Sequence, residues 1–256
     1  MDHQARWLNK VPLVTAYFWI IKILSTTVGE TGADYLIFDL RFGLVLTSLI
    51  AAVAMAAILA LQFRTDRYVP WTYWLAVVSL SIVGTLITDN LTDNLGVSLY
   101  VSTAVFAAAL ATTFWLWFRA EGTLSIRAVN TPSREAYYWA AILLTFALGT
   151  AAGDLISEEM GLGYALSGVI FAAAIAVVLA AFRFNVLSGV AAFWLAYVLT
   201  RPLGASIGDF LTQPARHGGL ALSTMTTSAA FLVVIAVLVA YLTLSGIDRE
   251  ERAAVR

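Results

Sequence analysis

The sequence predicts an all-α, polytopic membrane protein of eight transmembrane helices, built from four copies of a two-helix unit. Three observations lead to this fold class. First, 61% of the residues are hydrophobic and only 12% are charged, whereas a soluble chain is about half apolar and about a quarter charged. Second, eight apolar segments each approach the ~20 residues that a helix needs to cross a bilayer. Third, one sequence motif occurs four times along the chain.

The eight apolar segments are separated by short polar interruptions. They cover Pro12–Ala33, Leu40–Phe63, Trp71–Thr88, Val97–Phe118, Ala136–Ile156, Gly161–Phe182, Val186–Gly208 and Leu220–Leu244. The polar N-terminus, MDHQARWLNK, has no small-residue cleavage site. We therefore expect the first apolar segment to be a retained helix and not a signal peptide.

Basic residues gather on one side of the predicted helices. The N-terminus, the loops after the second, fourth and sixth helices, and the C-terminal tail hold Arg6, Lys10, Arg64, Arg67, Arg119, Arg127, Arg134, Arg183, Arg249, Arg252 and Arg256. The opposite loops and adjoining helix ends hold Arg41 and Arg216 together with nine acids, Glu30, Asp34, Asp39, Asp89, Asp93, Asp154, Glu158, Glu159 and Asp209. Because basic loops stay in the cytoplasm, we expect a multi-pass protein of a bacterial inner membrane with both termini cytoplasmic.

An internal repeat has the pattern [FY]-W-x9-G-x4-D. Its tryptophans are Trp19, Trp74, Trp139 and Trp194, its glycines are Gly29, Gly84, Gly149 and Gly204, and its aspartates are Asp34, Asp89, Asp154 and Asp209. The single transmembrane domain then divides into repeats at about 10–66, 67–122, 132–184 and 185–246, followed by a polar cytoplasmic tail at 247–256. Each unit holds two spans, so the copies are parallel and related about the membrane normal. A pseudo-fourfold arrangement and a pair of two-unit halves both fit this spacing.

The runs KVPLVTAYFWIIKILSTTVGETGADYL and FALGTAAGDL carry a resemblance to a known family. The chain resembles, over nearly its whole length, a bacterial family of four tandem two-helix membrane repeats with a characteristic tryptophan, a repeat of unknown function. The resemblance implies the architecture and no particular chemistry. The second unit departs from the pattern after its glycine, with TLITD where the third unit has TAAGD.

The repeat aspartates are the first candidates for a functional site. Fifteen residues from Trp to Asp span about 22 Å of helix, so four related helices would bring four carboxylates to one depth. Rings of acids attract and select cations. We expect ion binding by Asp34, Asp89, Asp154, Asp209, Glu30, Asp93 and Glu158, with the four repeat aspartates as metal ligands. The alternative is that these acids cap helices or lie in interfacial water.

Lys22 and Arg201 lie inside predicted spans, where an ionisable group is costly and is usually paired inside the bundle. Lys22, Glu30 and Asp34 follow one helix face at multiples of four residues. The sequence therefore predicts an ion pair of Lys22 with Glu30 or Asp89, either as part of a site or as a purely structural pair. Glu30 occupies the place of Thr85, Thr150 and Ala205 in the other units, so it breaks the repeat.

The repeat glycines and tryptophans have two readings each. The glycines either interrupt the helices, freeing carbonyls for an ion, or allow helices to pack closely, as small residues do in membranes. We favour close packing. The tryptophans are either interfacial anchors or core residues.

The function expected from these features is transport of a small hard cation. Nine acids against Lys22, Arg41, Arg201 and Arg216 would concentrate cations in the outer half. With oxygen ligands and no cysteine, Mn2+, Mg2+, Ca2+, Na+ or H+ fit better than Zn2+ or Cu+. We favour a divalent metal such as Mn2+. No cofactor beyond the transported ion and no nucleic-acid partner is expected; the partners are the lipid bilayer and the cation, with a homo-oligomer left open.

Three other functions are weighed against transport. A cation channel needs a continuous polar path, which the apolar inner halves of the odd-numbered helices disfavour. A membrane enzyme using paired carboxylates is disfavoured because no nucleophile, phosphate loop or cofactor motif accompanies the acids, so we do not expect an enzyme. A scaffold or sensor subunit would make the charged pairs structural.

Overall fold

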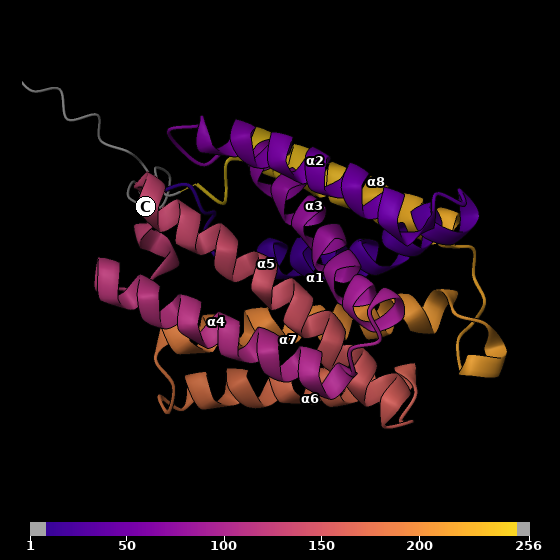
Figure 1. The fold of residues 1–256 in the computed structure, drawn as a ribbon. Coiled ribbons are helices and arrows are strands. Elements are labelled where there is room, and N and C mark those ends of the chain that lie inside the picture. Colours follow the sequence, from indigo (N-terminus) through magenta and orange to yellow (C-terminus); the bar gives the residue numbers. More distant parts are fainter. Residues whose placement is uncertain (1–8, 250–256) are drawn as a thin grey trace, which may run out of the picture.

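A computed structural model describes residues 9–249, and the predicted basic-side residues Arg6, Arg252 and Arg256 lie outside this range, as does most of the predicted tail. Within it the chain is all-helical, with eight α-helices and no strand (Figure 1). The helices are α1 (Ala16–Asp34), α2 (Gly43–Phe63), α3 (Pro70–Asp89), α4 (Leu99–Glu121), α5 (Pro132–Asp154), α6 (Tyr164–Arg183), α7 (Gly189–Thr212) and α8 (Thr224–Ser245). Three π-helical turns follow α1, α3 and α5, at Tyr35–Asp39, Asn90–Asn94 and Leu155–Glu159. Short 3-10 turns occur at Ile126–Ala128 and Ala215–His217.

The helix starts are set by capping side chains more than by the onset of apolar sequence. The Thr15 hydroxyl accepts a hydrogen bond from the Phe18 amide at 3.4 Å, so α1 begins four residues after the predicted Pro12. Thr131 caps α5 in the same way and Pro132 takes the first helical position, so α5 begins before the predicted Ala136. Capping oxygens satisfy amides that have no partner inside the helix, and proline suits a helix start.

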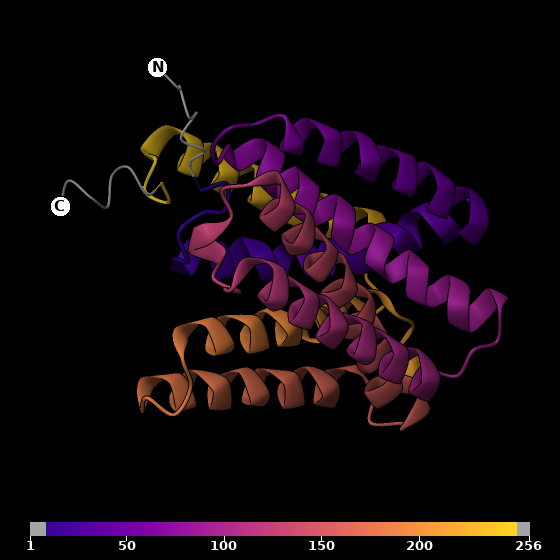
Figure 2. The same cartoon turned by 60° about the vertical axis from the view of Figure 1, so that its left-hand side comes forward.

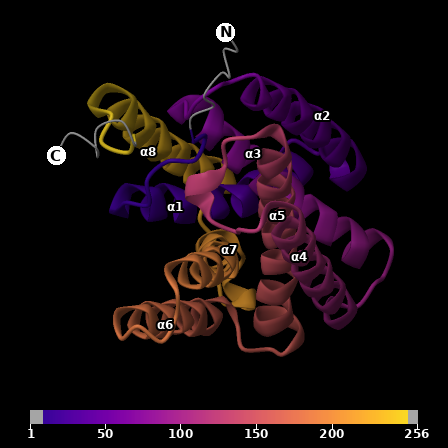
Figure 3. The same ribbon diagram turned by 90° about the vertical axis from the view of Figure 1, so that its left-hand side faces the viewer.

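The odd-numbered helices form the centre of the molecule, and we call α1, α3, α5 and α7 the inner ring. Helix α1 packs against α3, α3 against α5, α5 against α7, and α7 against α1. Figure 3, which views the bundle along its length, shows these four helices around the middle and α2, α4, α6 and α8 outside them. Figure 2 shows the outer helices running alongside the inner ones.

Each outer helix packs mainly on the inner helix of the next unit. Helix α2 packs on α3, α4 on α5 and α6 on α7, while α8 returns to pack on α1. The connections from α2 to α3 and from α6 to α7 are short, which favours antiparallel packing of these neighbours. The last helix therefore covers the first.

Seven of the described helices are long and apolar enough to cross a membrane, as expected for a membrane protein. They are Gly43–Phe63, Pro70–Asn94, Leu99–Glu121, Pro132–Glu159, Tyr164–Arg183, Gly189–Thr212 and Thr224–Ser245, where two include a π-helical turn. The outer helices expose apolar side chains such as Val53, Val177 and Val237. Such a surface is suited to lipid, since it has no favourable contact with water.

The core is richest in aromatic rings at the end of the bundle where the inner helices α3, α5 and α7 begin, which we call the basic end because the loops there carry Lys10, Arg64 and Arg127. Trp74, Trp139 and Trp194 are buried and Trp19 is half-buried. Three of the four repeat tryptophans thus serve core packing, and their interpretation as interfacial anchors does not hold for them. The opposite end, where the repeat aspartates lie, we call the acidic end.

Candidate functional site

The repeat aspartates occupy one structural position in the first three units. Asp34, Asp89 and Asp154 are each the last residue of an inner helix, and each is followed at once by a five-residue π-helical turn. Asp209 differs, because α7 continues as an α-helix to Thr212. π-Helical turns are uncommon and often occur at functional sites. The recurrence of a π-helical turn after three of the repeat aspartates indicates a candidate functional site at this end of the inner ring.

The four aspartates surround Glu30 without forming a metal cluster. Asp209 is buried, and Asp34, Asp89 and Asp154 are half-buried. The Glu30 carboxylate interacts electrostatically with all four. In the part of the chain that the structure describes, however, no three Asp, Glu or His side chains lie close enough to ligate one metal ion. Metal binding by the four aspartates stays a prediction.

The two further acids predicted for the site lie at its surface. Asp93 and Glu158 are both exposed and belong to π-helical turns. The Glu158 carboxylate accepts a hydrogen bond from the Tyr164 hydroxyl at 2.9 Å. It also lines an open pocket of about 350 Å³ at the acidic end, together with Ser157, Tyr164, Gln213 and His217.

Gln213 connects this pocket to the aspartates. It caps the end of α7, and its side-chain amide donates a hydrogen bond to Asp34 at 3.3 Å. By sequence position it stands where the second and third units have Asp93 and Glu158. The acidic end therefore has an open, polar entrance beside its half-buried carboxylates.

Arg201 lies at the centre of the inner ring and joins all four of its helices. The fully buried guanidinium on α7 donates to the Glu30 carboxylate at 2.7 Å and to the Thr26 carbonyl at 2.6 Å, both on α1. It also donates to the Thr85 hydroxyl on α3 and to the Thr150 hydroxyl on α5, the latter at 2.8 Å. The sequence predicted that Arg201 is intramembrane but did not predict these partners.

The three side chains that bond to Arg201 come from one repeat position. Glu30, Thr85 and Thr150 each lie eleven residues after their repeat tryptophan. Their convergence on one guanidinium explains why the acid appears in one unit only, since a single Arg needs a single countercharge. Burying an isolated charge is very unfavourable, so a charge in such a place needs a partner of this kind.

The predicted ion pair of Lys22 is wrong. Glu30 is held by Arg201, and no ion pair joins Lys22 to Asp89 or to any other acid among residues 9–249. The reason is reach: Glu30 is two turns beyond Lys22 on the same helix, about 12 Å along its axis, while Arg201 approaches Glu30 from the facing helix. The Lys22 ammonium instead lies over the rings of Phe146 and Tyr197, at 4.4 and 4.3 Å from their centroids.

The repeat glycines give the closest approaches between inner helices. A Cβ atom on each would overlap with the side chain seven residues after the tryptophan of the next unit. The pairs are Gly29 with Ser81, Gly84 with Phe146, Gly149 with Arg201 and Gly204 with Thr26. The helices run uninterrupted through all four glycines. Close packing is thus confirmed for these glycines, and the alternative of helix breaks is wrong.

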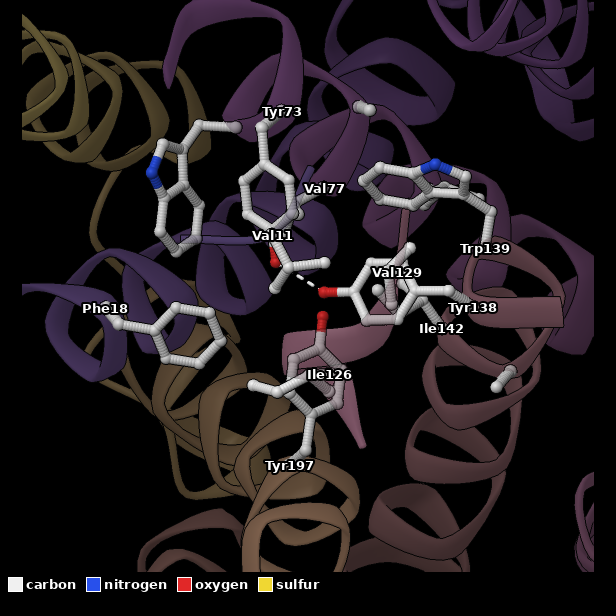
Figure 4. Close-up of a cluster of buried hydrophobic side chains, with 14 of the residues drawn as sticks. Val11, Phe18, Tyr73, Val77, Ile126, Val129, Tyr138, Trp139, Ile142 and Tyr197 are labelled. Carbon is white, nitrogen blue, oxygen red and sulfur yellow. Dashed lines mark hydrogen bonds between the residues drawn. The ribbon is translucent and has the colours of Figure 1, made fainter. Parts of the chain in front are cut away.

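Three tyrosine hydroxyls meet between the inner helices on the basic side of Lys22. In Figure 4 the hydroxyls of Tyr73, Tyr138 and Tyr197 point toward one another, and the first two are 2.5 Å apart. All three side chains are fully buried. This group was not predicted from the sequence, because Tyr197 does not belong to the repeat motif.

The basic end is closed by the segments that enter and leave the helices. Val11, Ile126 and Val129 are buried over the tyrosines (Figure 4). Lys10, which precedes Val11, forms a buried ion pair with Glu135 at 2.5 Å. This pair was also missed, although an acid among basic loops is a detectable signal.

Comparison with known proteins identifies the repeat and nothing further. The family described as Repeat of Unknown Function (DUF347) matches four times, at residues 17–68, 72–123, 137–185 and 192–248. No curated protein and no solved structure matches the chain. The four matches cover most of the chain in tandem, in the same places as the four structural units, and the chain therefore belongs to this family.

Proposed function

We propose that the chain is an eight-span transporter of a small hard cation, which enters through the carboxylates of the acidic end. The observation that carries the proposal is the crowding of acids there. Glu30, the four repeat aspartates and Glu158 interact with one another, and Arg201 is the cation among them that forms an ion pair. Carboxylates that repel each other at partial burial need protons or metal cations to neutralise them. A site of this kind favours cation binding.

The proposal includes α1 as an eighth span. With nineteen residues it is about 28 Å long. It packs among α3, α7 and α8, all apolar enough to cross a membrane. Its Lys22 and Glu30 lower its hydropathy, but both are buried inside the bundle. Eight spans place the basic loops on one side, which by the positive-inside rule is the cytoplasm of a bacterial inner membrane.

The proposal also includes a pseudo-fourfold axis along the membrane normal. Each glycine contact joins one unit to the next, and the fourth joins Gly204 back to Thr26 of the first unit. The inner helices contact one another in the same cyclic order. A ring of parallel repeats supports one central pathway in preference to four separate ones.

The chemistry of the acidic end fits a hard cation. Carboxylates, with amide oxygens such as that of Gln213 beside them, are the ligands preferred by Mn2+, Mg2+ and Ca2+. We place Mn2+ first among the ions to test. Ligation of a divalent ion requires the aspartates to move together, because they are too far apart to share one ion in this structure.

Closure of the axis favours a transporter over a channel. The Arg201 side chain joins the inner helices at mid-depth, the tyrosine hydroxyls meet below it, and Val11, Ile126 and Val129 cover the basic end. A channel needs a continuous polar path, whereas a transporter opens to one side at a time. The polar entrance at the acidic end fits an outward-facing state.

The test is ion uptake into proteoliposomes, with Mn2+, Mg2+, Ca2+, Na+ and H+ offered separately. We expect saturable uptake of one divalent ion that is lost in Asp89→Asn and Asp154→Asn. Asp66→Asn is the matched control, because Asp66 is exposed at the basic end. If the wild type moves none of these ions in either direction, the proposal fails. If the Asp89 and Asp154 variants transport normally, the site is wrong.

A further inference from the structure

Lys22 has an environment unlike that of Lys10, and these are the two lysines of the chain. The Lys10 ammonium pairs with Glu135 at 2.5 Å and donates to the Phe63 carbonyl at 3.3 Å. Lys22 is fully buried, and its ammonium has no hydrogen-bond acceptor among the described residues. Both lysines are inside the protein, but one has a countercharge and the other does not.

Among the described residues, the groups around Lys22 include no anion that pairs with it. Helix α7 presents Tyr197 and Arg201 to Lys22, and α5 presents Phe146. Next to Tyr197 lie Tyr73 of α3 and Tyr138 of α5 (Figure 4). Helix α8 packs on the same helix as Lys22, and its Tyr241 contacts Tyr17 instead. On α1 itself Glu30 is occupied by Arg201. The Arg201 guanidinium repels a positive charge on Lys22.

The environment of Lys22 acts on both charge states of its amine. An ammonium gains cation–π attraction from two ring faces but loses the water and acceptors it would otherwise bind. A neutral amine avoids that loss and the repulsion from Arg201. A buried amine on which such opposing effects act is a candidate to bind and release a proton.

Tyrosine hydroxyls provide a route for that proton toward the basic end. The Lys22 ammonium lies over the ring of Tyr197, whose hydroxyl has no hydrogen-bond partner among residues 9–249 and points at those of Tyr138 and Tyr73 (Figure 4). The ring of Tyr68 stands edge-on to that of Tyr73 at 5.6 Å, and the Tyr68 hydroxyl donates to Asp248 at 2.6 Å. A carboxylate near the C-terminal end of the described chain thus lies one ring contact and one hydrogen bond beyond Tyr73.

We infer that Lys22 is a proton-binding site in the centre of the bundle, served by the hydroxyls of Tyr73, Tyr138 and Tyr197. Its ammonium releases one proton to become an amine, and the proton leaves along the hydroxyls. The coupling of this proton release to ion movement rests on the proposed function. When a cation binds Glu30, Arg201 loses its countercharge, and the added repulsion expels the proton from Lys22. Binding of the cation and binding of the proton would then oppose each other, so that uptake of the one is linked to release of the other.

The site itself is tested by nuclear magnetic resonance of protein labelled with 15N at the lysine side chains. The chain gives two signals, which Lys10→Arg assigns while keeping the ion pair with Glu135. We expect the Lys22 signal to change from ammonium to amine within the pH range in which the protein stays folded, with the Lys10 signal as the internal reference. A Lys22 signal that stays in one charge state throughout this range overturns the inference, whether or not the protein transports any ion.

The route is tested by internal pH dyes in proteoliposomes. Tyr138→Phe should slow proton release about tenfold or more, as loss of a proton-transfer group does. Tyr137→Phe is the matched control, because Tyr137 stacks on Trp117 and is not one of the three tyrosines whose hydroxyls meet. If both variants release protons at the same rate, the tyrosine hydroxyls do not carry the proton. A Lys22 that titrates without proton-linked uptake keeps the site and contradicts its coupling.

Discussion

The Arg201 guanidinium and the Glu30 carboxylate meet at 2.7 Å in the centre of the inner ring, joining residues 171 positions apart in the sequence. Both side chains are buried, and the same guanidinium bonds to the other three inner helices through its remaining donors. One side chain therefore connects the first unit to the last and both to the two between them. Its loss should affect the whole bundle.

Arg201→Met should destabilise the bundle strongly, because it leaves Glu30 as an uncompensated buried charge. Breaking such a pair costs about 3–5 kcal/mol, whereas replacing both partners with apolar groups costs much less. The double variant Arg201→Met with Glu30→Met should therefore recover most of the loss. Thr85 and Thr150 keep backbone acceptors in both variants. Thermal unfolding in nanodiscs measures the difference, and a double variant as unstable as the single one would contradict the pairing.

Gly149→Ala tests the close approach of α5 to α7. The added methyl group would overlap with the Arg201 stem and lie 2.9 Å from Pro202. Overpacking of this kind costs about 1–3 kcal/mol. Gly153→Ala, one turn further along α5, is the control, because its methyl group would lie at an ordinary 3.6 Å from Pro202. We expect the first variant to lower the unfolding temperature and the second to leave it unchanged or raise it.

Asp209→Asn and Asp93→Asn should differ in their effect on ion uptake. Asp209 is buried on an inner helix, whereas Asp93 is exposed. Loss of the first should abolish uptake. Loss of the second should only weaken the attraction of cations to the entrance, an effect that salt screens. Uptake measured at low and high ionic strength separates them, and an equal loss in both variants at high salt would show that the exposed acid binds the ion directly.

Asp248 predicts a pH dependence of stability at the basic end. Burial raises the pKa of its carboxyl above the ordinary value, and the hydrogen bond from Tyr68 only partly opposes this. An acid with a raised pKa in the folded state stabilises most below its unfolded pKa of about 3.9 and loses this contribution as the pH rises through the folded value. Asp248→Asn, which still accepts from Tyr68, removes this loss.

The unfolding temperature of Asp248→Asn relative to wild type should therefore rise with pH from about 4 upward until the wild-type carboxyl is fully ionised. Asp66→Asn, which removes an exposed acid at the same end, provides the comparison. A constant difference between wild type and Asp248→Asn across the range would mean that burial does not perturb this carboxyl.

Sequence reasoning predicted the helices well because apolar length is a local property. Seven segments meet the requirement for spanning, and the helix α1 was predicted from its own apolar residues despite Lys22 and Glu30. The repeat also predicted that Glu30 has a role of its own, because the other three units have no acid at that position. The partner of a buried charge was not predictable in the same way, because it depends on which helix faces it and how far a side chain reaches. Lys22 lies closer to Glu30 in sequence, but Arg201 faces it in space.

The packing of each outer helix on the following unit could not be predicted from the sequence either. Hydropathy shows that α2 and α3 are each apolar enough to cross a membrane, but not that α2 packs on the inner helix of the next unit instead of on its own. The same holds for the π-helical turns after Asp34, Asp89 and Asp154, since no residue type specifies a π-turn in the way that Thr131 and Pro132 specify a helix start.

The return of α8 to α1 has a consequence for how the chain assembles and how it arose. Helix α1 is synthesised before the other seven described helices and α8 after them, so the bundle cannot close until α8 has been made. A fragment of two units would end with an uncovered inner helix at one edge and an unattached outer helix at the other. These edges complement each other, so two such fragments can close one bundle between them. The arrangement is therefore consistent with an ancestor of two units that closed the bundle as a homodimer before the two copies were fused.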